Sequence, residues 1–397
     1  MKTKIFIGVC IWFFLCGCVN NNRKSNQGLP VIDLTKNYPE KEFIADEADK
    51  EYIPLETTDD VLADRYFFIK YVSDQRIVGT NGMERGDILI FDGNGKVVSF
   101  FNHRGGSNNE YTYIISIVFD EKAKEVFVSD IQEKNRCLVY SEDGTYLRQF
   151  NYPDSSRIGA LYDFDAQTLL AYNGYFQEIS MDNINQRTPY VFLSKKDGSV
   201  VSRLDDISFT KRISNTRRLN LEAGFTRIGI STNSNIQYGQ EFIIADMSSD
   251  TVFVLTQDKK LTPLLVRTPS VFADEDKLTT LLVYFKTDAY LFFLTFTYDW
   301  NEIVALINRG QQQISLSSTR KVFAYDLRTG QIYSVKEPPP SVSAVDVYGK
   351  AAVNLINADD LVDRLEDGTL DGKLKQVAQK IDADDNPVLE IIKYNEK

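Results

Sequence analysis

Histidine, tryptophan and recognisable catalytic motifs are scarce in this sequence, and each scarcity excludes a class of site. The 397-residue chain has one histidine, His103, and two tryptophans. A single imidazole excludes zinc sites that are built on two or three histidines. The chain also lacks a G-x-S-x-G nucleophile elbow, a Walker loop and a G-x-G-x-x-G fingerprint. Its net charge of −11 argues against a general affinity for nucleic acid.

The N-terminus has a hydrophobic run that is too short to span a membrane. Ile5–Leu15 is an apolar run of eleven residues, and it follows two lysines within Met1–Lys4. A spanning helix needs about 20 residues, so this stretch is typical of a secretory signal. The next residues, Leu15-Cys16-Gly17-Cys18, resemble the bacterial lipobox, which implies cleavage after Gly17 and diacylation of Cys18. Two acyl chains would anchor the protein stably. A plain signal peptide with incidental cysteines is the alternative.

Cysteine is nearly absent from the mature chain that this cleavage predicts. Cys10 and Cys16 leave with residues 1–17, Cys18 carries the lipid, and Cys137 remains alone in an apolar stretch. No disulfide can form within such a chain, and we expect Cys137 to be a buried structural thiol. Residues 18–45 are expected to form a polar tether and an N-terminal extension.

A hairpin pattern recurs along the rest of the chain, which is rich in phenylalanine and tyrosine. An apolar strand, a tight turn and a second strand occur five times, at 88–98, 137–147, 190–201, 252–261 and 322–333. The turns are marked by Gly95, Gly144, Gly198, Lys259 and Gly330. Asn-Gly and Asp-Gly suit the twist of tight hairpins. The spacing averages about 59 residues, so residues 51–394 hold six units, the sixth shared between the two ends.

Further strands upstream of these hairpins predict the fold class. They are expected at 67–72, 76–80, 113–119, 125–129, 226–231, 241–245, 281–285 and 291–298. Four antiparallel strands per unit, repeated radially, predict an all-β, six-bladed β-propeller over residues 46–397. Polar stretches at 175–187, 205–222 and 308–319 are expected to be long loops. The sequence leaves open whether 303–319 form a strand, a helix or a lid.

The C-terminus supplies the predicted ring closure. Asp371–Ile381 has apolar residues at helical spacing, which predicts a short helical insertion, and Asn386-Pro387 ends it. Val388–Tyr394 is then expected to be a strand that pairs with Tyr52–Glu56. Such pairing would cover two strand edges that are otherwise prone to aggregate.

Three stretches resemble the six-bladed β-propeller lipoproteins common in Bacteroidetes, which are NHL-like or TolB-like in architecture and mostly of unknown function. They are the opening strand at 52–57, the loop Arg104–Tyr111, and the closing Asp385-Asn386-Pro387-Val388-Leu389. In the loop, Ser107-Asn108-Asn109 replace the family's Gly-Pro and make it one residue longer. The resemblance implies an outer-membrane lipoprotein of the cell envelope. Surface-displayed members usually carry acidic residues just after the cysteine, and none occurs here before Asp33, so we expect an anchor that faces the periplasm.

The loop from His103 to Tyr111 is the candidate site for a ligand or partner, because it joins blade one to blade two beside the central channel. Its candidate residues are His103, Arg104, Gly105, Gly106, Glu110 and Tyr111. Arg104 could clamp a carboxylate or phosphate, the glycines would let backbone amides approach a ligand, and Tyr111 could stack on a ring. In the structural alternative, Arg104 and Glu110 only fix the blade junction. A lone histidine without a partner is not expected to be catalytic.

Acidic clusters raise the question of a bound calcium ion. They lie at Asp92–Gly95, Asp163–Asp165 and Asp382–Asp385. None continues into an EF-hand, since the twelfth position counted from Asp92 is His103 rather than glutamate. We therefore predict no metal ligand and no cofactor, with a calcium ion in the channel as the weaker alternative.

Three functions follow from these observations. The leading one is a non-enzymatic, lipid-anchored binding module for an envelope protein or a small ligand, in one form accessory to an outer-membrane nutrient-uptake system. The rival is a lyase or hydrolase that acts on glycans or lactones through a channel-bound divalent cation and acids such as Asp120 or Asp163. The third is an envelope scaffold without a ligand.

Overall fold

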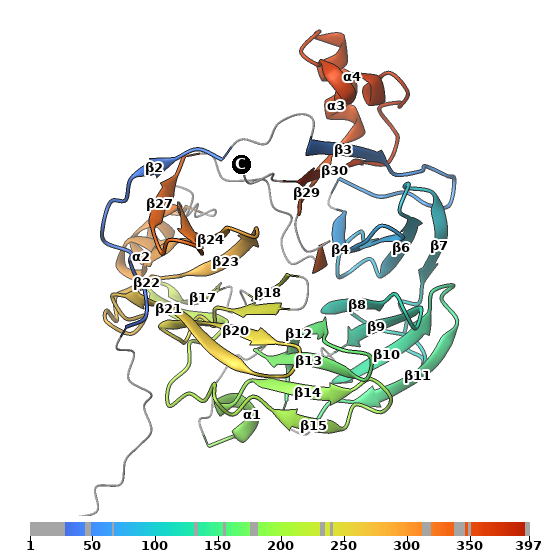
Figure 1. Ribbon diagram of the computed structural model, residues 1–397. Coiled ribbons are helices and arrows are strands. Elements are labelled where there is room, and N and C mark those ends of the chain that lie inside the picture. Colours follow the sequence, from blue (N-terminus) through green and yellow to red (C-terminus); the bar gives the residue numbers. More distant parts are fainter. Residues whose placement is uncertain are drawn as a thin grey trace, which may run out of the picture.

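The computed structural model is a ring of six β-sheets, which confirms the predicted fold class (Figure 1). It describes residues 28–43, 49–65, 67–130, 134–153, 156–174, 182–230, 235–238, 241–311, 319–336, 346–347 and 351–393. The predicted signal, the lipidation site and the first part of the tether, residues 18–27, therefore lie outside the described residues. Among the described residues, no helix is long and apolar enough to cross a membrane.

Blades 1 to 3 have four consecutive antiparallel strands each, ordered from the channel outward. Blade 1 has β4 (Phe68–Val72), β5 (Arg76–Thr80), β6 (Asp87–Asp92) and β7 (Val97–Asn102). Blade 2 has β8 (Ser116–Asp120), β9 (Glu125–Asp130), β10 (Arg136–Ser141) and β11 (Tyr146–Asn151). Blade 3 has β12 (Ile158–Asp163), β13 (Thr168–Asn173), β14 (Tyr190–Ser194) and β15 (Val200–Arg203).

Blades 4 and 5 each gain an outer strand from the N-terminus. Blade 4 has β18 (Asn235–Tyr238), β19 (Glu241–Ile244), β20 (Thr251–Thr256) and β21 (Leu261–Thr268), with β1 (Val31–Asp33) added in parallel to β21. Blade 5 has β23 (Leu282–Lys286), β24 (Tyr290–Thr295), β26 (Lys321–Asp326) and β27 (Ile332–Val335), with β2 (Glu40–Lys41) added in parallel to β27.

Blade 6 closes the ring. Its sheet runs β29 (Ala351–Ile356), β30 (Val388–Lys393) and β3 (Lys50–Pro54), and β28 (Asp346–Val347) pairs with β4 of blade 1. Antiparallel pairing of Tyr52 with Glu390 and of Ile53 with Leu389 confirms the predicted contact between the two ends of the chain.

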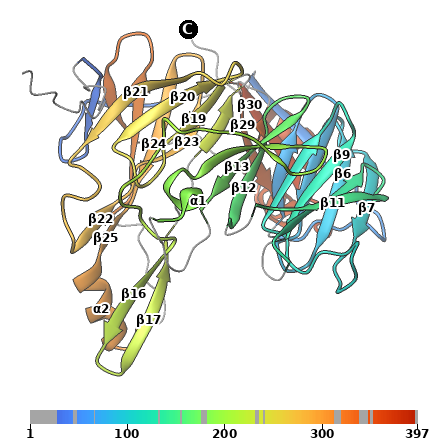
Figure 2. The ribbon, with the colours of Figure 1, turned by 90° about the horizontal axis from the view of Figure 1, so that it is seen from below.

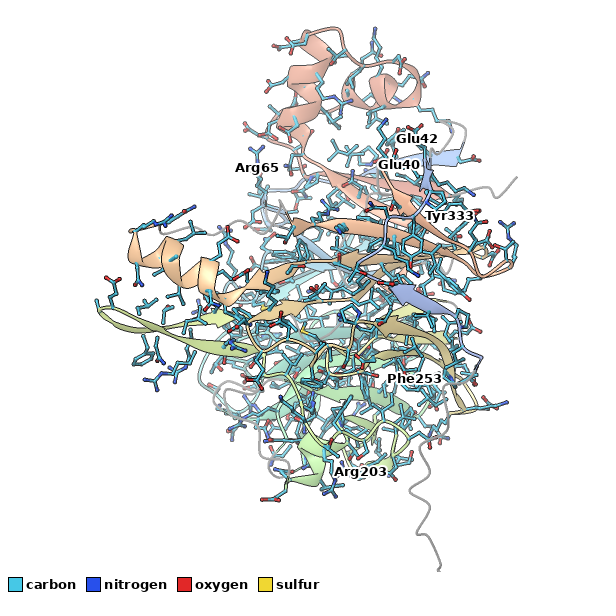
Figure 3. The ribbon with its side chains drawn as sticks, turned by 90° about the vertical axis from the view of Figure 1, so that its left-hand side faces the viewer. Glu40, Glu42, Arg65, Arg203, Phe253 and Tyr333 are labelled. Atoms are coloured by element: carbon cyan, nitrogen blue, oxygen red, sulfur yellow. The ribbon has the colours of Figure 1, made fainter. Side chains whose placement is uncertain are left out.

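The N-terminal segment 31–54, here called the strap, therefore serves three consecutive blades. It supplies the outermost strand of blade 4 (β1), blade 5 (β2) and blade 6 (β3). Figure 3 shows Glu40 and Glu42 of the strap beside Tyr333 of β27, and the Lys41 ammonium lies 4.9 Å from the centre of the Tyr333 ring. Residues 31–41, which the sequence assigns to an extension, are thus packed on the propeller.

All five predicted hairpins are present, and their turns have the expected backbone. Gly95, Gly144, Gly198 and Gly330 have φ between 71° and 84°, and Lys259 adopts the same left-handed conformation at 62°. Each turn lies between the third and fourth strand of its blade, which explains why the repeat is visible in the sequence at these positions.

The core is divided between the blade interfaces. Six buried apolar clusters each join two neighbouring blades. At the closure, Ile53 and Leu389 of blade 6 share a cluster with Ile69 and Leu89 of blade 1. Phenylalanine and tyrosine dominate the largest fully buried side chains, so the aromatic composition serves the packing between blades.

Several segments differ from the predicted secondary structure. Of the predicted blade strand 226–231, the described residues 226–229 belong instead to β17 (Gly224–Gly229), which pairs with β16 (Thr216–Leu221) in a separate hairpin. Part of the predicted loop 205–222 is therefore a strand. Residues 300–308 form helix α2 (Trp300–Asn308), which settles the first part of the open stretch 303–319; residues 312–318 lie outside the described residues.

The remaining helices are short. Four helices occur in the described part of the chain: α1 (Ile184–Arg187), α2, α3 (Ala358–Glu366) and α4 (Gly372–Ala378). Helix α4 confirms the predicted C-terminal helix, with Asp371 as its N-cap residue. Helix α3 was not predicted, and it packs with α4 through a small cluster that includes Leu361 and Leu370.

The long insertions all leave the ring on one side. Connections between second and third strands, and between consecutive blades, start from the same end of the strands, and these connections contain α1 to α4 and the hairpin β16–β17. We call this side the loop face. Figure 2 shows α2 and β16–β17 projecting together from the ring.

Two equivalent turn glycines give a matched test of this packing. A Cβ on Gly198 would lie 2.2 Å from the Phe150 ring, whereas a Cβ on Gly330 would meet its nearest atom, the Tyr325 hydroxyl, at 3.9 Å. Both alanine variants bear the left-handed strain of about 1–2 kcal/mol. Gly198→Ala adds an overpacking cost of about 1–3 kcal/mol, so urea unfolding should show it to be clearly less stable than Gly330→Ala. Equal losses would contradict the turn-on-ring contact.

Candidate functional site

The predicted loop at 103–111 is built into the junction between blades 1 and 2. The Tyr111 ring is 0% exposed, its hydroxyl donates to the Gly86 carbonyl at 2.5 Å, and it accepts from the His103 amide at 3.0 Å. Burial raises the pKa of Tyr111 well above its ordinary range. The ring therefore packs in the core and presents no face on which a ligand could stack.

The His103 side chain is likewise engaged by blade 2. Its Nε2 lies 2.7 Å from the Gly144 carbonyl oxygen, and its ring stacks on Tyr140 with the ring centres 5.0 Å apart. These contacts give the histidine a packing role at the interface between blades.

Blade 2 also holds the backbone of the loop. Lys134 donates to the carbonyls of Gly106 and Ser107, each at 3.0 Å, and Tyr140 donates to that of Asn109 at 2.8 Å. The buried Arg136 guanidinium donates to the carbonyls of Asn108 and Glu110. Five consecutive carbonyls, from residue 106 to residue 110, thus accept hydrogen bonds from blade 2, which fixes the loop rigidly.

Of the remaining predicted residues, some fit a structural role at the blade junction and others are free to bind a ligand. Glu110 accepts from the Ser107 amide at 2.8 Å, and this bond, with others, lowers its pKa. A Cβ on Gly105 would meet the Glu110 carboxylate at 2.1 Å, so this glycine makes room for Glu110. Arg104 and Gly106 are exposed, and a Cβ on Gly106 would meet no atom within 4 Å. The geometry thus favours the structural alternative for most of the loop, and ligand binding by its exposed part stays a prediction.

A second feature, which the sequence did not predict, is a lobe on the loop face. It consists of the hairpin β16–β17, the strand pair β22 (Lys277–Thr279) and β25 (Thr297–Asp299), and helix α2. The lobe has its own buried cluster, which includes Leu219, Tyr298, Trp300 and Ile303. Arg217 ties the hairpin to the helix, because its guanidinium lies 4.7 Å from the Trp300 ring. The available sequence signal was the strand-like stretch 226–231, which predicts a strand but not the hairpin to which it belongs.

The outer face of this hairpin combines two arginines with an exposed ring. Arg218 and Arg227 are directly opposite each other across the two strands. The Phe225 side chain is 51% exposed, and the guanidinium carbons of Arg218 and Arg227 lie 4.1 and 5.5 Å from its ring centre. We call Arg218, Phe225 and Arg227 the arginine–phenylalanine patch.

The third feature is a cavity in the central channel. It has a volume of about 300 Å³ and is lined by the innermost strands of blades 1 to 4. Its wall is mostly apolar and aromatic, and its ionisable members include Lys70 and Asp163. A pocket of this size and lining is typical of small-molecule sites.

The two acids of the rival enzyme hypothesis meet at one lysine. The Lys195 ammonium lies 2.5 Å from Asp120 and 2.6 Å from Asp163, and the side chains of Lys195 and Asp120 are each 8% exposed. Burial lowers the pKa of Lys195, but the attraction of the two carboxylates outweighs it, and the net pKa is raised. Burial raises the pKa of Asp163 despite that lysine. The geometry is that of an ion triad between blades 2 and 3, in which Lys195 and Asp120 are buried and the Asp163 side chain is 29% exposed.

The acidic clusters proposed for calcium cap turns. Asp92 accepts from the amides of Asn94 and Lys96, and Asp385 accepts from that of Asp382. Within the described residues, no group of three or more histidine, cysteine, aspartate or glutamate side chains is arranged to hold a metal ion. The Cys137 thiol is buried as expected, and burial raises its pKa to about 12, which keeps it protonated and unreactive.

Removing the Lys195 ammonium should expose the cost of the ion triad. Lys195→Met leaves the buried Asp120 carboxylate and the partly buried Asp163 carboxylate without their shared cation, and we expect the free energy of unfolding to fall by about 3–5 kcal/mol at pH 7. The deficit should shrink at pH 5, because burial already raises the pKa of Asp163 and its protonation relieves the unpaired charge. Urea unfolding of this variant beside Lys196→Met, an exposed neighbour, measures both effects. Identical stability of the two variants would show that the triad contributes nothing.

Comparison with known proteins places the chain in a family. The model described as "Domain of unknown function (DUF4934)" matches residues 29–393. A solved protein from Bacteroides fragilis, described as exported, is 14% identical, with a TM-score of 0.62 over 92% of this chain and 100% of its own. A DUF4221 member from Bacteroides vulgatus is 11% identical, with a TM-score of 0.49 over 89% of this chain and 97% of its own. No curated protein matches the sequence.

The first of these structures shares the propeller fold, and at this identity it says nothing about activity. The family model covers most of the chain, from the start of the strap to the closing strand β30. The chain therefore belongs to the DUF4934 family, whose function is unknown.

Proposed function

We propose that this protein is a lipid-anchored, non-enzymatic binding module of the cell envelope, and that it docks an acidic protein surface through the arginine–phenylalanine patch. The observation that supports the proposal best is the patch itself. An exposed phenylalanine in contact with two arginines projects from the ring on a lobe with its own core. Aromatic residues and arginine are the side chains that most often dominate the energy of protein interfaces.

The patch places two like charges opposite each other on the hairpin that carries it. Like charges directly opposite each other on two strands repel, and Arg218 and Arg227 occupy such a pair. An exposed ring gains little from burial in the free protein. A strand pair that breaks a local rule of stability in this way is expected at a functional surface. In a chain of net charge −11 this basic patch is also a distinct electrostatic feature that would steer an acidic partner.

The anchor is proposed at Cys18, after removal of residues 1–17, with residues 18–45 as tether and extension and 46–397 as the propeller. Residue 31, where the strap joins blade 4, follows Cys18 by 13 residues. A fully extended chain of that length spans about 45 Å. The propeller would thus stay close to the membrane, where an envelope partner could be reached.

We place the protein in the outer membrane facing the periplasm, beside a nutrient-uptake system. The lipobox-like Leu15–Cys18, the lack of acids before Asp33 and the likeness to an exported Bacteroides protein support this placement. Exposed Arg104 lies on the same loop face and is included as a further contact. The rival lyase or hydrolase receives no comparable support, since Asp120 and Asp163 are held by Lys195.

Affinity isolation of the intact protein from its native membrane tests the proposal. Charge reversal at both arginines, Arg218→Glu with Arg227→Glu, should reduce the amount of co-isolated partner by about tenfold or more. The matched control reverses two exposed lysines in turns at the opposite end of the strands, Lys122→Glu with Lys196→Glu, and should retain the partner. Cys18→Ser should move the protein from the membrane fraction to the soluble fraction.

Two outcomes would overturn the proposal. One is a wild-type protein that is isolated alone. The other is a partner that is recovered equally with the arginine double variant and with the lysine control. A Cys18→Ser protein that stays in the membrane would refute the anchor alone.

A further inference from the structure

The central cavity contains a lysine that a backbone irregularity turns toward it. In blade 1, Ile69 pairs with Gly79 and Tyr71 pairs with Val78, so Lys70 is the extra residue of a β-bulge in β4, the first strand of this blade. Lys70 lines the cavity together with residues of β8, β12 and β18. Bulges re-aim side chains and are frequent beside functional sites.

This lysine has no anionic neighbour in the described part of the chain. No hydrogen bond or ion pair of its ammonium occurs there, and its described contact is with the Phe68 ring, 5.7 Å from the ring centre. Burial lowers the pKa of Lys70, and no carboxylate counteracts that effect. Asp163, which lines the same cavity, is paired with Lys195 instead. A partly buried ammonium in an apolar wall is unfavourable unless an anion accompanies it.

A second donor in the cavity wall is also unsatisfied. Asn235 is 5% exposed, and its side-chain oxygen accepts from the Tyr190 hydroxyl at 3.3 Å. Its amide nitrogen is buried and has no acceptor among the described residues. A buried donor without a partner costs about 1–3 kcal/mol, and such an exception in a native protein calls for an explanation.

We propose that the channel cavity is a binding site for a small organic anion, with a carboxylate that pairs with Lys70 and an apolar body that packs on the rings of the wall. The 300 Å³ volume limits the ligand to a small molecule. Phe68, which is 43% exposed, and Tyr162 offer aromatic surface. Asn235 borders the cavity, but its amide nitrogen is buried, so the carboxylate is held by Lys70. This site is separate from the arginine–phenylalanine patch, and neither proposal depends on the other.

Calorimetric titration of the full chain with benzoate, phenylacetate and hexanoate tests the charge and the apolar body together. At least one of the three carboxylates should bind the wild type. If benzoate binds, its neutral analogue benzamide should bind at least about tenfold more weakly. Lys70→Met should weaken the bound carboxylate by about tenfold or more, and Asn235→Ala should weaken it less. Lys196→Met, outside the cavity, should leave it unchanged.

The proposal is overturned if none of the three carboxylates binds at millimolar concentration. It is also overturned if Lys70→Met and Lys196→Met bind a carboxylate equally well. Retention of native circular dichroism by each variant separates loss of binding from loss of fold.

Thermal unfolding without ligand provides an independent arm. The pKa of Lys70 is lower in the folded chain than in the unfolded chain. At a pH between these two values the unfolded chain binds more protons, so the stability of the wild type should rise with pH there. Lys70→Met removes the desolvated charge, so its Tm should exceed that of the wild type at pH 7, and the excess should shrink as the pH rises. A lower Tm for Lys70→Met would show a paired lysine and overturn the proposal.

Discussion

The strap is the constraint on which the rest of the structure depends. A propeller is a closed ring only if its last blade is joined to its first, and here the N-terminal strand β3 completes the same sheet as the C-terminal strand β30. The strap does more than close the ring, because β1 and β2 also add outer strands to blades 4 and 5. Half of the ring is therefore held together by one segment, described at residues 31–43 and 49–54, which also covers edges that would otherwise pair with other chains. An anchor attached just before residue 31 would act on this segment and so on three blades at once.

A rigid ring makes two different kinds of surface available. The insertions of the loop face can vary without disturbing the blades. The lobe is the clearest example, because Trp300 and Leu219 belong to a buried cluster of its own. The channel is the opposite case, because its wall consists of the blades' innermost strands and changes there affect packing directly. A lysine at a bulge in that wall is thus a costly feature, whereas an arginine pair on the hairpin is a mild one.

The sequence predicted the parts of the fold that local chemistry determines. Turn glycines, alternating apolar strands and the closing Val388–Tyr394 stretch each act through short-range rules, and the hairpins and ring closure follow from them. The strap was missed because β1 and β2 have three and two residues and pair in parallel with distant strands. The same limit applies to the sites. Tyr111 looked available for a ligand, but only its long-range partners, Gly86 and Tyr140, show that it is buried, and nothing local marks Lys70 as a bulge residue.

Amide hydrogen exchange of the full chain tests the central claim that the strap is an integral part of the ring. If β3 is the structural end of the last blade, its amides and those of β30 should exchange together, at the slow rate of central strands such as β9 and β10, because they open only when the whole ring unfolds. The peptide that covers β1 should be protected as well. Rapid exchange of residues 50–54 while β30 and the central strands stay protected would contradict the account, since the strap would then be a loosely attached tail.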